Sequence, residues 1–253
     1  MQSEVEQALK EYLLAMGDDE FLLGHRDSEW CGHAPILEED IAFANIALDE
    51  IGHAGLWYGL LADLEGAEGT EHANRLIYWR EEPDFRNAQL VELPNGDWAF
   101  SMLRQFLFDA YENVRLQALS ESAYAPLEQV AGRVRREEAY HLRHSQAWVT
   151  RLAQGTEESH RRMQAALVAI WPFTPQLFAK GPGESLLVDA GIAPASEEFR
   201  PAWEARLLPL FSASDLQTPA EAVPASRSEH TQHLKTLLAD LQSVARLDPQ
   251  AGW

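Results

Sequence analysis

The sequence contains little that would support disulfides, membrane insertion or secretion. A single cysteine, Cys31, among 253 residues excludes an internal disulfide and is typical of a reducing compartment. No apolar run is long enough to span a bilayer, and the polar, acidic start MQSEVEQALKEY does not resemble a signal peptide. We therefore expect a cytoplasmic protein.

Basic residues are also scarce. The chain has 20 Lys and Arg against 40 Asp and Glu, which gives a formal net charge of −20 and an isoelectric point near 4.7. A surface this acidic repels phosphate backbones and anionic lipid. We expect neither nucleic acid nor a membrane as partner, whereas a basic protein partner stays open. Apolar residues make up 46% of the chain, which is enough for a sizeable core.

Helical periodicity dominates the sequence, with no strand alternation and no low-complexity segment. Turn-forming residues divide four long predicted helices into two hairpins joined by a long connection. This is the connectivity of ferritin-like bundles. We expect an all-α fold with one ferritin-like domain over residues 1–253, a four-helix-bundle core at about 3–155 and a helical C-terminal extension at about 156–253. The long helices are expected at 3–29, 35–65, 97–122 and 126–154, and shorter ones at 156–170, 197–211 and 227–246.

Two Glu-x-x-His pairs, Glu50/His53 and Glu138/His141, lie on predicted helices. Residues three apart share a helix face, so each pair could chelate one metal ion. The motif alone is weak, and a surface ion pair is the ordinary interpretation of any single match, such as the third one at 157–160. Here both pairs lie in apolar stripes, where unpaired ionisable side chains are costly.

Hairpin geometry predicts which acids face these pairs. In an antiparallel helix pair, residues equidistant from the turn lie at the same depth, so Glu20 should face Glu50, and Asp109 should face Glu138. One acid from each of two helices, with Glu-x-x-His from the other two, is the ligand pattern of di-iron and di-manganese bundles. The sequence therefore predicts a site for two iron or manganese ions, against the alternative of a buried polar network without metal. The expected ligands are Glu20, Glu50, His53, Asp109, Glu138 and His141.

Asp49 and Glu137 immediately precede the two motif glutamates. Metal-bound histidine usually donates its second N–H to an acceptor, so each acid could orient a histidine of the opposing hairpin. An exposed acid on an acidic helix is an equally good interpretation. Cys31 is expected to be a small buried residue within its turn.

Several segments resemble the C subunits of phenylacetyl-CoA epoxidase, the multicomponent ring-oxygenating monooxygenase of phenylacetate breakdown. They cover the chain nearly end to end and are LLGHRDSEWCGHAPILEEDIAFANIALDEIGHA, ELPNGDWAF, EEAYHLRHSQAWVTRL, WPFTPQLF and HTQHLKTLLADLQ. The resemblance implies a ferritin-like fold and a partnership with a catalytic A subunit that holds the di-iron centre. It also implies a structural role for the C subunit, which commonly lacks a full ligand set.

This sequence departs from that pattern because all six expected ligands are present. Two functions therefore stay open. In the first, the chain is the scaffold partner of the A subunit, and its site is vestigial or stabilises the bundle. In the second, it is a stand-alone di-iron or di-manganese oxidoreductase that activates oxygen. A ferritin-type iron store is a third option that the long C-terminal part does not favour. Self-association and the catalytic activity of the chain itself are left open.

Overall fold

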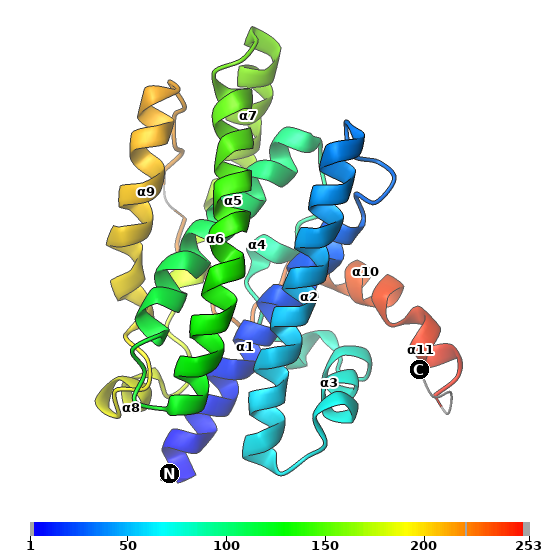
Figure 1. Cartoon of the computed structure of the whole chain (residues 1–253), viewed down its shortest axis with the longest axis vertical. Coiled ribbons are helices and arrows are strands. Elements are labelled where there is room, and N and C mark those ends of the chain that lie inside the picture. Colours follow the sequence, from blue (N-terminus) through cyan, green and yellow to red (C-terminus); the bar gives the residue numbers. More distant parts are fainter. Residues whose placement is uncertain (1–2, 221, 250–253) are drawn as a thin grey trace.

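Four long helices form the centre of the molecule. In the computed structural model, which describes residues 3–220 and 222–249, they are α1 (Ser3–Ser28), α2 (Leu37–Glu65), α5 (Trp98–Leu119) and α6 (Ala125–Ala153). All four run along the long axis of the molecule (Figure 1). Every regular element of the described residues is helical, so the expected all-α, ferritin-like bundle is confirmed.

The four helices are paired as the sequence predicts. α1 and α2 form one hairpin and α5 and α6 form the other, each closed by a short connection, residues 29–36 and 120–124. The long crossover between the hairpins contains α3 (Gly69–Tyr78), the 3-10 turn η1 (Glu82–Asp84) and the single turn α4 (Gln89–Glu92). Two hairpins joined by one long crossover are the ferritin-like arrangement.

Local sequence signals account for most of the helix boundaries. Asp97 caps α5, because its Oδ1 accepts a hydrogen bond from the backbone N–H of Phe100 at 3.0 Å. α2 ends at Gly66, whose φ of 64° lies in the left-handed region that favours glycine. α2 begins at Leu37 and not at Pro35 as expected, since residue 36 is still extended.

The C-terminal part of the chain adds shorter helices around the bundle. Of these, α7 and α9 pack against α5, and α10 and α11 extend to the right in Figure 1. The expected helix at 227–246 was wrong at its start, because residues 227–231 are not helical and Thr231 caps a helix that begins at Gln232. The elements are α7 (Glu157–Ile170), η2 (Trp171–Phe178), α8 (Glu184–Asp189), η3 (Ser196–Phe199), α9 (Arg200–Ala213), α10 (Gln232–Leu241) and α11 (Ser243–Leu247).

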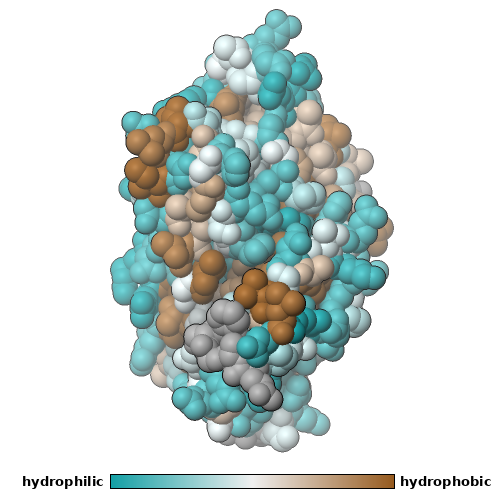
Figure 2. Space-filling model, turned by 90° about the vertical axis from the view of Figure 1, so that its right-hand side faces the viewer, coloured by the Kyte–Doolittle hydropathy of each residue, from teal (hydrophilic) through white to brown (hydrophobic). Residues whose placement is uncertain are grey.

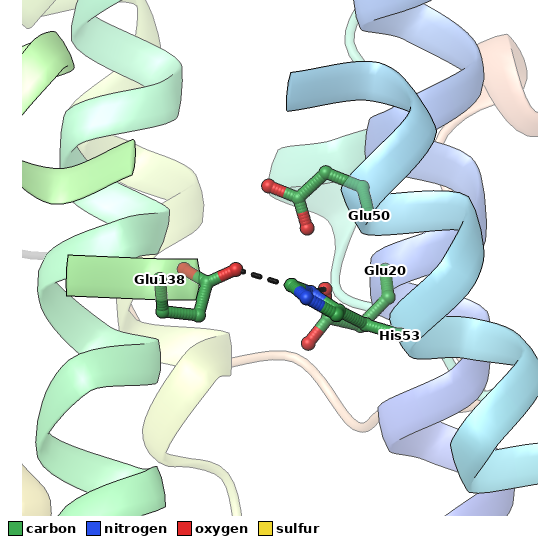
Figure 3. Close-up of side chains that lie close together, drawn as sticks. All are labelled: Glu20, Glu50, His53 and Glu138. Atoms are coloured by element: carbon green, nitrogen blue, oxygen red, sulfur yellow. Dashed lines mark ion pairs between the residues drawn. The ribbon is translucent and has the colours of Figure 1, made fainter. Parts of the chain in front are cut away.

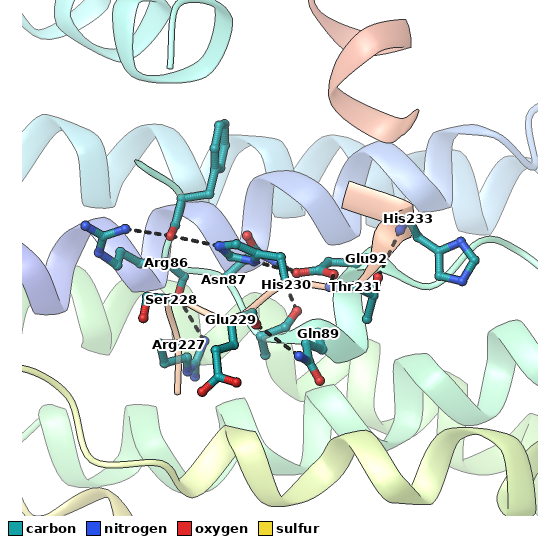
Figure 4. A network of polar contacts seen from close by, with 12 residues as sticks. Arg86, Asn87, Gln89, Glu92, Arg227, Ser228, Glu229, His230, Thr231 and His233 are labelled. Atoms are coloured by element: carbon teal, nitrogen blue, oxygen red, sulfur yellow. Dashed lines mark hydrogen bonds and ion pairs between the residues drawn. The ribbon is translucent and has the colours of Figure 1, made fainter. Parts of the chain in front are cut away.

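Two buried acids, Asp19 and Glu92, hold this non-helical segment in place, and Figure 4 shows the contacts around Glu92. Arg227 Nη1 lies 2.7 Å from both carboxylate oxygens of Asp19 on α1. His230 Nδ1 lies 2.7 Å from Glu92 Oε1, and the backbone N–H of Thr231 donates to Glu92 Oε2 at 2.6 Å. Both acids are fully buried, so these contacts compensate charges that would be costly if left unpaired. Tertiary contacts therefore override the helical pattern of the segment.

The apolar stripes predicted from periodicity form the core. The predicted inner residues of α1 and α2 are all buried, namely Leu9, Leu13, Met16, Leu23, Phe43, Ile46, Trp57 and Leu60. Cys31 is exposed, so its expected burial was wrong: it lies in the turn after α1, where the chain leaves the bundle. Among the described residues, no helix is long and apolar enough to cross a membrane.

Candidate metal centre

The six predicted ligands lie in the interior, on the four helices of the bundle. Each of these residues is at most 1% exposed. α1 contributes Glu20, α2 contributes Glu50 and His53, α5 contributes Asp109, and α6 contributes Glu138 and His141. A cluster of ionisable groups at this depth must be compensated by hydrogen bonds, by opposite charge or by metal.

Four of the six predicted ligands converge on one point. Glu20, Glu50, His53 and Glu138 each offer one ligand atom, and these atoms lie within 4.8 Å of one another. Glu138 points across the bundle from α6 toward His53, whereas the other three side chains come from the facing hairpin (Figure 3). His53 Nδ1 lies 3.3 Å from Glu138 Oε1 and 3.6 Å from Glu20 Oε2. The depth rule for hairpins therefore correctly brought Glu20 and Glu50 together.

His141 adjoins the same cluster from the other side. Its Nδ1 lies 3.0 Å from Glu138 Oε1 and 3.3 Å from Glu50 Oε1. The two imidazole rings have their centroids 5.9 Å apart. Glu138 Oε1 thus lies within 3.3 Å of an Nδ1 atom from each histidine, so this carboxylate links the two imidazoles.

Asp109 and His141 are the two predicted ligands outside the converging group, and Asp109 is engaged in hydrogen bonds. Its Oδ1 accepts a hydrogen bond from Gln105 Nε2 at 2.8 Å, and its Oδ2 accepts one from Ser145 Oγ at 2.6 Å. Gln105 also donates to Glu50 Oε1 at 2.9 Å, so it links the two acids. Sequence reasoning missed Gln105 and Ser145, although each lies four residues from a predicted ligand on the same inner stripe.

Asp49 and Glu137 each contact the histidine of the opposing hairpin. His53 Nε2 lies 2.8 Å from Glu137 Oε2, and His141 Nε2 lies 3.2 Å from Asp49 Oδ2. Each imidazole therefore points Nε2 at a half-exposed acid and Nδ1 at the cluster. This is how carboxylates orient metal-binding histidines in known metal sites. It agrees with the role considered from the sequence, whereas metal ligation itself stays a prediction.

The electrostatics of the metal-free cluster are dominated by burial and by crowded acids. Burial, together with Glu138 and Glu20, raises the pKa of Glu50 well above its usual value. Although burial opposes it, contact with Glu138 and Glu20 raises the pKa of His53 to about 12. Contacts with His141 and His53 lower the pKa of Glu138 to about 2 against the effect of burial. Protonated histidines thus balance the acids when no cation is bound.

Buried atoms without hydrogen-bond partners fit a metal site. Within the described residues these include both carboxylate oxygens of Glu20, Oε2 of Glu50, Oε2 of Glu138 and Nδ1 of His53. Buried polar atoms in native proteins are nearly always satisfied, so a group of them around one point needs an explanation. Carboxylate oxygens and imidazole nitrogens are suitable ligands for iron and manganese. These oxygen and nitrogen atoms, and their lack of hydrogen-bond partners, therefore fit a site for divalent metal ions.

Glu112 is a further buried acid that the sequence did not reveal. It lies one turn after Asp109 on α5, and it forms a close ion pair with Arg115. Burial raises the pKa of Glu112 to about 8, and the nearby charges of Glu20 and Glu138 add to the shift. In the sequence, an acid and an arginine three residues apart look like a surface pair. Only the tertiary structure shows that both are buried beside the cluster.

The sequence profile of one protein family, described as phenylacetic acid catabolic protein, matches residues 1–253. The chain belongs to this family. The C subunit of 1,2-phenylacetyl-CoA epoxidase from Escherichia coli strain K12 is 38% identical over 248 residues, which cover 97% of this chain and 99% of that protein. The A subunit of 1,2-phenylacetyl-CoA epoxidase from the same organism is 25% identical over 158 residues, which cover 62% of this chain and 49% of that protein. This member of the phenylacetic acid catabolic protein family is thus similar to two different components of one enzyme.

Proposed function

We propose that this chain is the scaffold subunit of a ring-epoxidising phenylacetyl-CoA monooxygenase in phenylacetate catabolism, and that it also binds two iron or manganese ions. Its similarity to the C subunit of the epoxidase along nearly the whole chain supports the first part. The converging buried atoms without hydrogen-bond partners carry the second part. We further propose that residues 1–253 act as one ferritin-like domain, in the cytoplasm, beside a catalytic A-type subunit.

The proposed ligands divide between the two hairpins. Glu20, Glu50 and His53 would hold one ion, and the second would be held by Asp109, Glu138 and His141. Iron, when bound, would supply the electrons that activate dioxygen. The protein itself orients both imidazoles through Asp49 and Glu137, and it excludes water by complete burial of the ligands. Because Asp109 lies outside the group of converging ligand atoms, the second ion should bind more weakly than the first.

Metal content tests the metal-binding part directly. The purified chain, loaded anaerobically with ferrous iron and freed of loose metal, should retain close to two ions per chain by elemental analysis. A titration should resolve a tighter and a weaker site. Retention of no metal after such loading would refute this part and leave the cluster as a buried polar network.

The second candidate function is oxygen activation by this chain alone. The unsatisfied carboxylates favour it, since a purely structural subunit has no need of them. A single-turnover assay separates the two: iron-loaded, reduced protein is mixed with oxygen and phenylacetyl-CoA, and product is followed by mass spectrometry. We expect iron oxidation without ring oxygenation unless the A-type subunit is present. Stoichiometric ring oxygenation by the chain alone would instead make it the oxygenase.

A further inference from the structure

A small cavity lies beside α1, α5 and α8, and it has a volume of about 40 Å³. No predicted metal ligand is among the described residues that line it. Hydrophilic residues separate hydrophobic patches on the face of the molecule shown in Figure 2, whereas the wall of the cavity combines arginine and tyrosine side chains with apolar ones. About 10–15 Å³ is enough to hold one water molecule, so the cavity has room for roughly three or four waters or for one molecule of about the size of acetate.

Three arginines line the cavity, in a chain that has only 20 basic residues against 40 acidic ones: Arg86, Arg115 and Arg227. Arg115 is only 2% exposed, its Cζ lies 5.0 Å from the ring centroid of Tyr111, and it forms a close ion pair with Glu112. A guanidinium group presents its N–H donors in one plane, which matches the geometry of a carboxylate. The arginines therefore favour a ligand with oxygen acceptors.

Several hydrogen-bond donors around the cavity have no acceptor. The hydroxyl of Tyr12 and Nε of Arg115 are buried and have no partner among the described residues. Tyr111 is 2% exposed, and its hydroxyl forms no hydrogen bond within residues 3–220 and 222–249. Arg227 contacts Asp19 through Nη1 alone, which leaves the N–H groups of its Nε and Nη2 without an acceptor in the same part of the chain. Buried donors without acceptors are costly, and a ligand that supplies acceptors removes this cost.

The acids that line the cavity already have partners. Glu11 Oε2 lies 3.2 Å from Arg86 Nε, and the buried Glu184 accepts a hydrogen bond from Ser196 Oγ. They compensate part of the positive charge, but in the described part of the chain neither acid bonds to a tyrosine hydroxyl of the cavity. The rest of the wall is small or apolar, namely Ala15, Ala179, Gly181, Pro182 and Leu187. The cavity thus combines an excess of donors with an apolar wall.

We propose that this cavity binds a small monocarboxylate of about the size of acetate. Its carboxylate accepts hydrogen bonds from Arg115, from Arg227 and from the two tyrosine hydroxyls, and its methyl group contacts the apolar wall. A carboxylate offers about four acceptor positions, and its charge makes each hydrogen bond roughly twice as strong as a neutral one. Water alone is the competing occupant, because it also satisfies donors but carries no charge. The site does not depend on metal binding at the candidate centre.

Saturation-transfer NMR of the full chain with sodium acetate tests the proposal, at an ionic strength kept constant with sodium chloride. Saturation transferred from the protein to the acetate methyl protons should rise to a plateau, with a dissociation constant in the millimolar range. Acetamide, a neutral molecule of the same size, is the matched probe. It should bind at least about ten-fold more weakly, because it has no charge to strengthen its hydrogen bonds.

Two variants locate the bound acetate. Tyr12→Phe removes a hydroxyl that has no partner among the described residues, so it should keep the melting temperature and weaken acetate binding about ten-fold. Tyr124→Phe, at a half-buried tyrosine outside the cavity wall, is the matched control and should keep the wild-type affinity. Ala15→Leu places a larger side chain at the cavity wall and should abolish binding, and a thermal melt confirms that this variant is folded.

Three results would overturn the proposal. The first is the absence of saturable acetate binding at high millimolar concentration, which would leave water as the occupant. The second is an equal affinity for acetamide, because the cavity would then recognise an uncharged acceptor. The third is acetate binding that is unchanged in both Tyr12→Phe and Ala15→Leu, because the ligand would then lie elsewhere on the chain.

Discussion

Replacing Glu50 by alanine tests whether this residue is a metal ligand or part of a structural polar network. Glu50 is fully buried, its pKa is raised by burial and by neighbouring acids, and its Oε2 has no hydrogen-bond partner among the described residues. Removal of this carboxylate relieves like-charge repulsion in the metal-free cluster. Gln105, which donates to Glu50, keeps its hydrogen bond to Asp109. The metal-free variant should therefore melt at the wild-type temperature or above it.

The expected effect of metal on the melting temperature follows from chain length. For 253 residues unfolding together, the unfolding entropy near the midpoint is about 0.5 kcal/mol/K. An ion present at 100 times its dissociation constant adds about 2.7 kcal/mol of stability. Each bound ion should thus raise the wild-type midpoint by about 5 °C, and Glu50→Ala should lose this increase.

Thermal melts with and without ferrous iron, under anaerobic conditions, provide the measurement. Asp63→Ala, an exposed acid on the same helix, is the control and should keep the wild-type increase. If metal-free Glu50→Ala melts about 10 °C lower, equivalent to about 5 kcal/mol, Glu50 belongs to a satisfied structural network and the reasoning fails. An unchanged response of the variant to iron would refute ligation by Glu50.

Three other predictions concern the surroundings of the cluster. The folded, metal-free protein keeps the proton of His53 up to a pKa of about 12, whereas the unfolded chain loses it near 6.5. His53 alone should therefore lower metal-free stability above pH 6.5 by about 1.4 kcal/mol per pH unit, His141, whose pKa is also raised, should add to this fall, and ferrous affinity should rise over the same range; urea titrations and metal titrations at pH 6, 7 and 8 check both trends. Asp49→Asn should weaken metal binding by about 10- to 100-fold because it loosens the orientation of His141, and it should cost the metal-free protein only about 0–1 kcal/mol because the lost ion pair is half-exposed; equal affinity would exclude that role. Arg227→Met should cost up to about 3–5 kcal/mol by leaving the buried Asp19 with only the more distant Arg115, at 3.9 Å, as an ion-pair partner, which lowers the midpoint by up to about 6–9 °C, and the double variant with Asp19→Asn should recover most of the loss.

Much of the fold could be predicted because it depends on regular geometry. The constant rise of a helix makes distance from the turn a measure of depth, and this correctly brought Glu20 and Glu50 together. The sequence also offered, as one of two equal interpretations, that Asp49 and Glu137 orient a histidine of the opposing hairpin, and each acid does lie beside one. Periodicity and depth are properties of the backbone, so they can be read from the sequence alone.

Features that depend on side-chain orientation could not be predicted in this way. Asp109 lies at the expected depth, but its oxygens are engaged by Gln105 and Ser145, and no spacing rule decides between such alternatives. The helical pattern at 227–231 was misleading for a similar reason. Compensation of the buried Asp19 by Arg227 is a contact between distant parts of the chain, and it outweighs local propensity.

The contact between Asp19 and Arg227 also affects the order of folding during synthesis, because it can form only after Arg227 has been made. The two residues are 208 positions apart in the chain. At about 5–20 residues per second, roughly 10–40 s pass between the synthesis of Asp19 and that of Arg227. Throughout that interval the first helix carries an acid whose closest charged partner does not yet exist. Until Arg227 is made, Asp19 has only the backbone N–H of Ala88, at 2.6 Å, and Arg115, at 3.9 Å, as partners, so we expect its burial to become fully stable only when translation is nearly complete.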